Sequence, residues 1–130
     1  MMKVISTDDA PAAVGPYSQA VEIDGTVYVS GQIPVDPKTG SIPDNLPDQA
    51  DRCLRNIRSI LEAAGLGMKD MVKVNVYITD MSAFAEVNKV YAGFFEEPYP
   101  ARVCVGVASL PKGVGLEIDA IAVRKRCSSD

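Results

Sequence analysis

Apolar residues change their spacing twice between residues 50 and 95, which limits the chain to folds that alternate helices with strands. From 50 to 64 they lie three and four apart, which is typical of an amphipathic helix. From 71 to 78 the spacing falls to two, which predicts a strand with one apolar face. From 84 to 95 the helical spacing returns. Because helices join successive strands here, some neighbouring strands must be parallel.

The limits of these elements follow from capping and helix-breaking residues. The first helix is expected to begin near Pro47 and to end at Gly65. Its buried stripe consists of Ala50, Cys53, Leu54, Ile57, Ile60, Leu61 and Ala64. The strand is expected to bury Val72, Val74, Val76 and Ile78. Asp80 or Ser82 can cap the second helix. Its stripe is mainly aromatic and should pack in the core: Phe84, Val87, Tyr91, Phe94 and Phe95.

The remaining segments predict further strands around these elements. Asp24-Gly25 suits the positive backbone angles of a tight hairpin turn, and four prolines make residues 34–47 a surface loop. The other strands are expected at 3–5, 20–23, 27–29, 102–107 and 116–123. Leaving aside the short first strand, the order is β-β-α-β-α-β-β. This order predicts an α+β fold with a mixed β-sheet and two helices packed on one face.

The second face of this sheet needs a different covering. Two helices can cover only one face, so the other must be solvated or must meet another subunit. Ile121 and Val123 are apolar but out of phase with Leu116 and Ile118. This pattern favours contact with another subunit.

Composition excludes several classes of protein. A chain of 130 residues fits one domain, here residues 1–130. The net charge of −4 argues against nucleic-acid binding, and we interpret the basic triplet Arg124-Lys125-Arg126 as the start of a solvated tail. The first fifteen residues have no leader-like apolar segment, and no later apolar run approaches membrane-spanning length. The spacing of the cysteines does not match a metal site or a redox dithiol, so we expect free thiols at Cys53, Cys104 and Cys127. We therefore expect a cytoplasmic protein without a membrane partner.

The chain contains no histidine, which excludes serine-histidine and cysteine-histidine catalysis. Arg102 and Glu117 stand out among the remaining polar residues, because each lies in an otherwise apolar strand where a charge needs a partner or a cleft. The two side chains could simply pair with each other or face solvent. Arginine is the natural clamp for a small carboxylate, since its planar fork donates two charge-assisted hydrogen bonds at once.

Other strand residues have simpler interpretations. Cys104 should lie on the same face as Arg102, two residues away, and is read as a small buried hydrophobe because no histidine can activate it. Lys73 and Asp119 are expected at edge or exposed positions. Tyr17 follows a turn from which its hydroxyl could reach a site, although a capping role is equally reasonable. Gly31 lies at a strand end, where the missing side chain allows close approach of a ligand or backbone.

Taken in order, several short motifs resemble the RidA (YjgF) family of reactive-intermediate deaminases over nearly the whole chain. They are Gly-Pro-Tyr-Ser-Gln at 15–19, Ser-Gly-Gln-Ile-Pro at 30–34, Glu-Ala-Ala-Gly at 62–65, Val-Asn-Lys-Val-Tyr at 87–91, Pro-Ala-Arg-Val-Cys-Val at 100–105 and Leu-Glu-Ile-Asp-Ala-Ile-Ala at 116–122. The resemblance implies a chorismate-mutase-like fold and a homotrimer whose sheets form a central barrel. It also implies active clefts between neighbouring subunits.

The resemblance implies roles for individual residues of this chain. Arg102 would hold the substrate carboxylate, and Glu117 would position and activate water. Tyr17 would hydrogen-bond the reacting region. The matching cleft positions are Ser30, Gly31, Asn88 and Cys104. Val103 and Gly106 occupy positions that are often polar in relatives, and the segment before Pro100 is short, so the shape of the cleft and its substrate range are less defined.

The activity implied is that of a 2-iminobutanoate/2-iminopropanoate deaminase, which hydrolyses 2-imino acids to 2-keto acids and ammonia with no metal and no cofactor. The alternative is a non-enzymatic trimer that binds a carboxylate metabolite or acts as a regulatory or chaperone-like protein. Glu117 argues against a simple carboxylate receptor, because a second negative charge near the ligand would weaken binding. An endoribonuclease is disfavoured by the lack of histidine and by the negative net charge.

Overall fold

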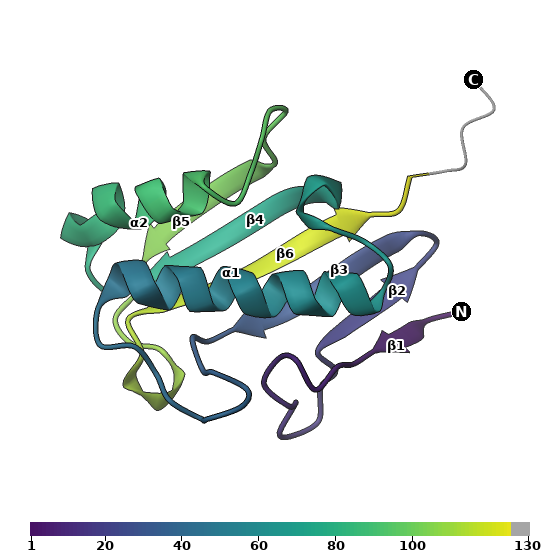
Figure 1. The fold of residues 1–130 in the computed structure, drawn as a ribbon, viewed down its shortest axis with the longest axis horizontal. Helices are drawn as coiled ribbons and strands as arrows, with labels where there is room; N and C mark the ends of the chain where they lie inside the picture. The colour runs from purple at the N-terminus through teal and green to yellow at the C-terminus, as the bar shows by residue number, and fades with distance from the viewer. Residues whose placement is uncertain (126–130) are drawn as a thin grey trace.

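The computed structural model describes residues 1–125, in which six strands form one mixed sheet and two α-helices cover one of its faces (Figure 1). The strands are β1 (Lys3–Ile5), β2 (Ala20–Ile23), β3 (Thr26–Gln32), β4 (Met71–Ile78), β5 (Ala101–Gly106) and β6 (Leu116–Val123). The helices are α1 (Leu46–Ala63) and α2 (Phe84–Ala92). These observations confirm the expected α+β class and the expected element order.

The sheet order is β1-β2-β3-β6-β4-β5, so the last strand of the chain lies in the middle of the sheet. β4 and β5 are parallel, and the other pairs are antiparallel. The core lies between the sheet and the helices, where Leu54, Ile57 and Leu61 of α1 are fully buried with Val74 and Ile118 of the sheet. Within the described residues, no helix is long and apolar enough to cross a membrane.

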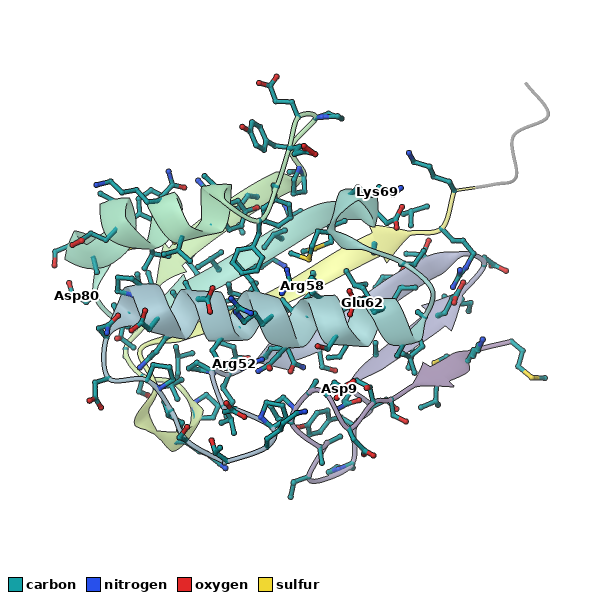
Figure 2. All side chains as sticks on the ribbon, viewed as in Figure 1. Asp9, Arg52, Arg58, Glu62, Lys69 and Asp80 are labelled. Carbon is teal, nitrogen blue, oxygen red and sulfur yellow. The ribbon has the colours of Figure 1, made fainter. Side chains whose placement is uncertain are left out.

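The first helix forms where the sequence indicates it. The side chain of Asn45 accepts a hydrogen bond from the Asp48 backbone N–H at 2.9 Å and so caps the helix, and Pro47 lies in its first turn. At the other end Gly65 adopts a positive φ of 76°, a conformation that ends helices at low cost in glycine. Figure 2 shows the charged side chains of Arg52, Arg58 and Glu62 around α1.

Two strands differ from expectation because of irregular pairing. β3 extends through Gln32, well beyond the predicted end at Val29, and its pairing with β6 shifts register between these two residues. In β4 the register shifts between Met71 and Lys73, so Met71 is buried and Val72 is 45% exposed. The prediction that Val72 belongs to the apolar face is therefore wrong, because a bulge reverses the alternation there.

The second helix is shorter than its apolar stripe. The Asp80 side chain accepts a hydrogen bond from the Ser82 backbone N–H, but it caps a 3₁₀ turn at Met81–Ala83, and α2 begins only at Phe84. The helix ends at Ala92, so Phe94 and Phe95 pack from the segment that follows it. β5 is displaced from the predicted 102–107 by one residue.

Three charged residues lie in surroundings that differ from those the sequence suggested. Lys73 and Asp119 are half-buried on β4 and β6, which are interior strands, so the expectation of edge or exposed positions is wrong. Arg124 is not part of a solvated tail, because its guanidinium makes two 2.9 Å bonds to Glu22 and donates to the Ala64 carbonyl. These contacts join the end of β6 to β2 and to the end of α1. Arg126 and Cys127 lie outside the described residues.

The Tyr91 hydroxyl is the basis of a stability prediction. Tyr91 is only 7% exposed, and its hydroxyl has no hydrogen-bond partner among the described residues. A buried polar group without a partner costs about 1–3 kcal/mol. We expect Tyr91→Phe to raise the free energy of unfolding by about 1 kcal/mol in urea titrations. A decrease of that size would mean that the hydroxyl is satisfied in solution.

Candidate functional site

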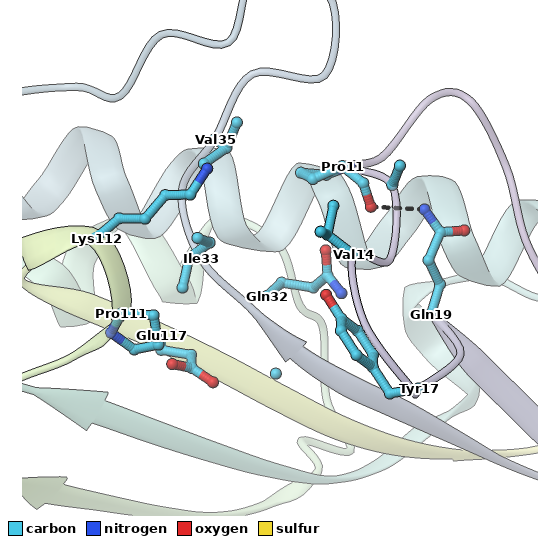
Figure 3. A pocket seen from close by; sticks show the side chains of 12 residues that line it. Pro11, Val14, Tyr17, Gln19, Gln32, Ile33, Val35, Pro111, Lys112 and Glu117 are labelled. Carbon is cyan, nitrogen blue, oxygen red and sulfur yellow. Dashed lines mark hydrogen bonds between the residues drawn. The ribbon is translucent and has the colours of Figure 1, made fainter.

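A pocket of about 540 Å³ opens beside the ends of β3 and β6 (Figure 3). The loop at residues 11–17 forms one wall, and the turn at Pro111–Gly113 forms the other. Glu117 and Lys112 come from one side, and Tyr17 comes from the other. The apolar part of the wall consists of Pro11, Val14, Ile33, Val35 and Pro111. We call this the Glu117 pocket.

Glu117 is a half-buried carboxylate on β6, opposite Tyr77 in the antiparallel register with β4. Its carboxylate makes no hydrogen bond or ion pair with other side chains of residues 1–125. Burial raises the pKa of Glu117, and the negative charge of Asp119 raises it further. A carboxyl group with a raised pKa is a stronger base than a free carboxylate, which suits proton transfer.

Gly31 makes room for the Glu117 side chain. It lies at the irregular end of β3, and a Cβ there would overlap Glu117 Oε2 and come within 3.0 Å of Cδ. The neighbouring Ser30 does not line the pocket. Its hydroxyl donates to the Ser18 carbonyl at 2.6 Å, and its backbone N–H donates to the Gln19 carbonyl at 2.9 Å. Ser30 therefore holds the segment that carries Tyr17.

Tyr17 is held by its backbone while its ring remains accessible. The Tyr17 N–H donates to the Gly15 carbonyl at 2.9 Å, and the side chain is 52% exposed at the pocket. The buried Gln19 amide donates to the Pro11 carbonyl at 2.8 Å, the contact drawn in Figure 3. This buried glutamine, which the sequence analysis missed, fixes the loop opposite Glu117.

A polar network next to Glu117 was also missed. Asp119 accepts hydrogen bonds from the Asn75 amide at 2.7 Å and from the Tyr77 hydroxyl at 2.9 Å. The Asp119 hydrogen bond raises the pKa of Tyr77, so this hydroxyl remains a donor. The signal was present in the alternation of β4 and β6, which places Asn75, Tyr77, Glu117 and Asp119 on one face.

Arg102 belongs to a second group of residues on β5 and α2. Its Nη1 donates to Asn88 Oδ1 at 2.7 Å, and its Cζ lies 4.7 Å from the centre of the Tyr91 ring and 5.3 Å from that of Phe84. Arg102 makes no ion pair with any described carboxylate. Cys104 shares its face of β5, is half-buried, and has its pKa raised by burial.

The structure separates Arg102 from Glu117. Arg102 is in register with Val74, whose side chain is buried beneath the helices, whereas Glu117 is in register with Tyr77 on the opposite face. Successive residues of β4 alternate between faces, so Val74 and Tyr77 point to different sides. The open interpretation that Arg102 and Glu117 pair within one chain is therefore wrong. Tyr17 and Gly31 join Glu117, whereas Asn88 and Cys104 join Arg102.

Comparison with known proteins identifies the family. The family described as Endoribonuclease L-PSP matches residues 7–124, and a crystal structure of RidA from a Psychrobacter species superposes with a TM-score of 0.90 at 50% identity, over 93% of this chain and 98% of that one. The chain belongs to the RidA (YjgF) family.

Other RidA relatives carry more specific names. The 2-iminobutanoate/2-iminopropanoate deaminase of Salmonella typhimurium is 52% identical over 128 residues, covering 96% of this RidA chain and 100% of the relative. The crystal structure of Escherichia coli TdcF with bound serine has a TM-score of 0.91 at 52% identity, over 95% of this chain and 99% of that one. Within residues 1–125 of this RidA protein, no three His, Cys, Asp or Glu side chains cluster as metal ligands.

Proposed function

We propose that this RidA protein is an enzyme that hydrolyses small 2-imino acids, such as 2-iminobutanoate and 2-iminopropanoate, to 2-keto acids and ammonia. The observation that carries the proposal is the Glu117 carboxylate, which is half-buried, unpaired within the described residues and directed into a pocket. The deaminase name of the Salmonella relative supports the same reaction.

In this mechanism Arg102 binds the carboxylate of the imino acid and fixes its C=N carbon in front of a water molecule. Glu117 accepts a proton from the water as its oxygen bonds to that carbon, and it passes this proton to the imine nitrogen, which regenerates the carboxylate. The product of this step is a carbinolamine. Glu117 then takes the hydroxyl proton and returns a proton to nitrogen, the C–N bond breaks, and ketone and ammonia leave. Tyr17 donates a hydrogen bond near the reacting atoms.

The opposite placement of Arg102 and Glu117 favours a site shared between two chains. The face of the sheet without helices exposes apolar side chains, among them Tyr28, Val103, Val105 and Val123. We propose that this face packs against other copies in a homotrimer, with the Glu117 pocket of one subunit facing Arg102 of the next. Three such sites would form per trimer.

The direct test generates 2-iminobutanoate in situ with a threonine dehydratase and follows 2-ketobutanoate formation, with semicarbazide trapping the free imine. Acceleration by catalytic amounts of this protein, lost in Arg102→Ala, supports the proposal. If the folded wild type gives no acceleration with several 2-imino acids, the enzyme proposal is wrong and carboxylate binding at Arg102 becomes the leading function.

The network around Asp119 predicts a shift in the pH profile. Glu117 must be ionised to accept a proton, so kcat/KM falls as pH drops through its pKa. Asp119→Asn removes the negative charge that raises this pKa, and the acid limb should move to lower pH. The other titratable or charged side chains near Glu117 are Tyr17, Cys53, Tyr77 and Lys112.

Tyr77→Phe is the matched control for this pH experiment. It removes one hydrogen bond to Asp119 but keeps the Asp119 charge, so the acid limb should stay near its wild-type position. If the acid limb moves equally in both variants, the hydrogen-bond network, and not the Asp119 charge, sets the pKa of Glu117.

A further inference from the structure

Arg102 is held by aromatic rings in a way that the proposed reaction does not by itself require. Its guanidinium carbon lies over the rings of both Tyr91 and Phe84, and one of its N–H groups donates to Asn88. All three partners come from α2, at positions 84, 88 and 91. This spacing places them on one face of the helix, next to the edge strand that carries Arg102.

Aromatic partners affect an arginine differently from acidic ones. A carboxylate partner would neutralise the guanidinium and occupy two of its N–H groups. The ring faces attract the cation through their negative electron density and leave its N–H groups free. Only the bond to Asn88 uses a donor toward a described side chain. The guanidinium is therefore oriented while it keeps its charge and donors for an incoming carboxylate.

The rings are themselves rigidly supported. Tyr91 is buried, and its ring lies 4.6 Å from that of Phe95 at an interplanar angle of 37°. Phe84 is half-buried at the start of α2. A long side chain on an exposed edge strand otherwise samples many rotamers, and fixing it before binding lowers the entropic cost of binding.

We propose that Phe84 and Tyr91 are positioning residues that hold Arg102 ready for a carboxylate, by stacking against its guanidinium without consuming its hydrogen-bond donors. This proposal rests on the proposed function, because it assigns the Arg102 ligand to the carboxylate of the 2-imino acid. The rings touch the arginine and need not touch the substrate.

The variants are Phe84→Leu, Tyr91→Leu and Tyr91→Phe, and the matched control is Phe94→Leu. Phe94 is also half-buried and also lies under an arginine, with Arg58 5.5 Å from its ring centre, but it does not contact Arg102 through a cation–π pair. Phe84→Leu and Tyr91→Leu should each raise KM for 2-iminobutanoate about fivefold with little change in kcat, the size of one exposed cation–π contact. Tyr91→Phe and Phe94→Leu should keep the wild-type KM.

Two further readouts separate positioning from a general loss of structure. In an Arg102→Lys background, which keeps a positive charge for the carboxylate but lacks the planar guanidinium, Phe84→Leu should have little additional effect on kcat/KM. The Arg102 Nε–H signal in a ¹H–¹⁵N spectrum should be shifted by the ring currents in the wild type and should lose part of that shift in Tyr91→Leu and in Phe84→Leu.

The outcomes distinguish this proposal from the proposed function. If the wild type is active but Phe84→Leu changes KM no more than Phe94→Leu does, the positioning role is wrong while the deaminase function stands. An additive effect of Phe84→Leu in the Arg102→Lys background also overturns it. If the wild type shows no activity, the proposed function fails and the substrate assignment fails with it, whereas the Arg102 signal still reports whether the stacking exists.

Discussion

Glu117→Gln is expected to lower kcat for 2-iminobutanoate hydrolysis by about 10²–10⁴-fold, the range that positioned acid–base groups contribute. Glutamine has nearly the same shape and fits the space left by Gly31, but it cannot accept the proton of the attacking water. KM should change little, because the proposed mechanism assigns binding of the carboxylate to Arg102 and not to Glu117. Initial rates over a range of dehydratase-generated imine concentrations measure both constants.

Glu62→Gln is the control for this substitution. Glu62 is an exposed glutamate on α1, so the same chemical change far from the pocket should leave kcat unaltered. Circular dichroism and thermal melting would establish that both variants are folded. A folded Glu117→Gln protein that retains more than about one tenth of the wild-type kcat would remove Glu117 from the role of general base.

The regular helices and strands could be predicted, because the spacing of apolar residues indicates which face of each element is buried. The alternation at Val74, Val76 and Ile78 and the stripe of α1 correspond directly to buried faces. The bulge at Val72 could not be predicted, since an inserted residue changes the phase of a strand without leaving a marker in residue type. The early end of α2 was missed for a similar reason: Phe94 and Phe95 continue the apolar stripe although the helix has ended.

The sequence singled out candidate site residues one by one, but it did not show how they are arranged. Arg102 and Glu117 stand out as charges within apolar strands, yet only the sheet order shows that they point to opposite faces. The sequence indicated core packing for Phe84 and Tyr91, which is correct for Tyr91. It did not show that β5 would bring a guanidinium over both rings, because that contact depends on how the edge strand lies beside α2.

The placement of Arg102 and Glu117 on opposite faces of the sheet predicts that two inactive variants can restore each other's activity. Arg102→Ala and Glu117→Gln chains, each inactive alone, should regain activity when they are co-assembled in the proposed homotrimer. If each site takes Glu117 from one subunit and Arg102 from the next, every trimer that contains both chains has one intact site of three, so the recovered rate should be about a third of the wild-type rate. Co-expression with two different tags and tandem purification would yield trimers of mixed composition.

The control is a mixture of the two variants assembled separately and combined without subunit exchange, which should stay inactive. Recovery in the co-assembled sample alone means that the two halves of the site meet across a subunit boundary, since no chain in it carries both residues. If mixed trimers, confirmed by sedimentation, remain as inactive as their parents, each active site uses Arg102 and Glu117 of the same chain. That result would require the sheet to expose Arg102 and Glu117 to a common cleft, against the register that β4 imposes on β5 and β6.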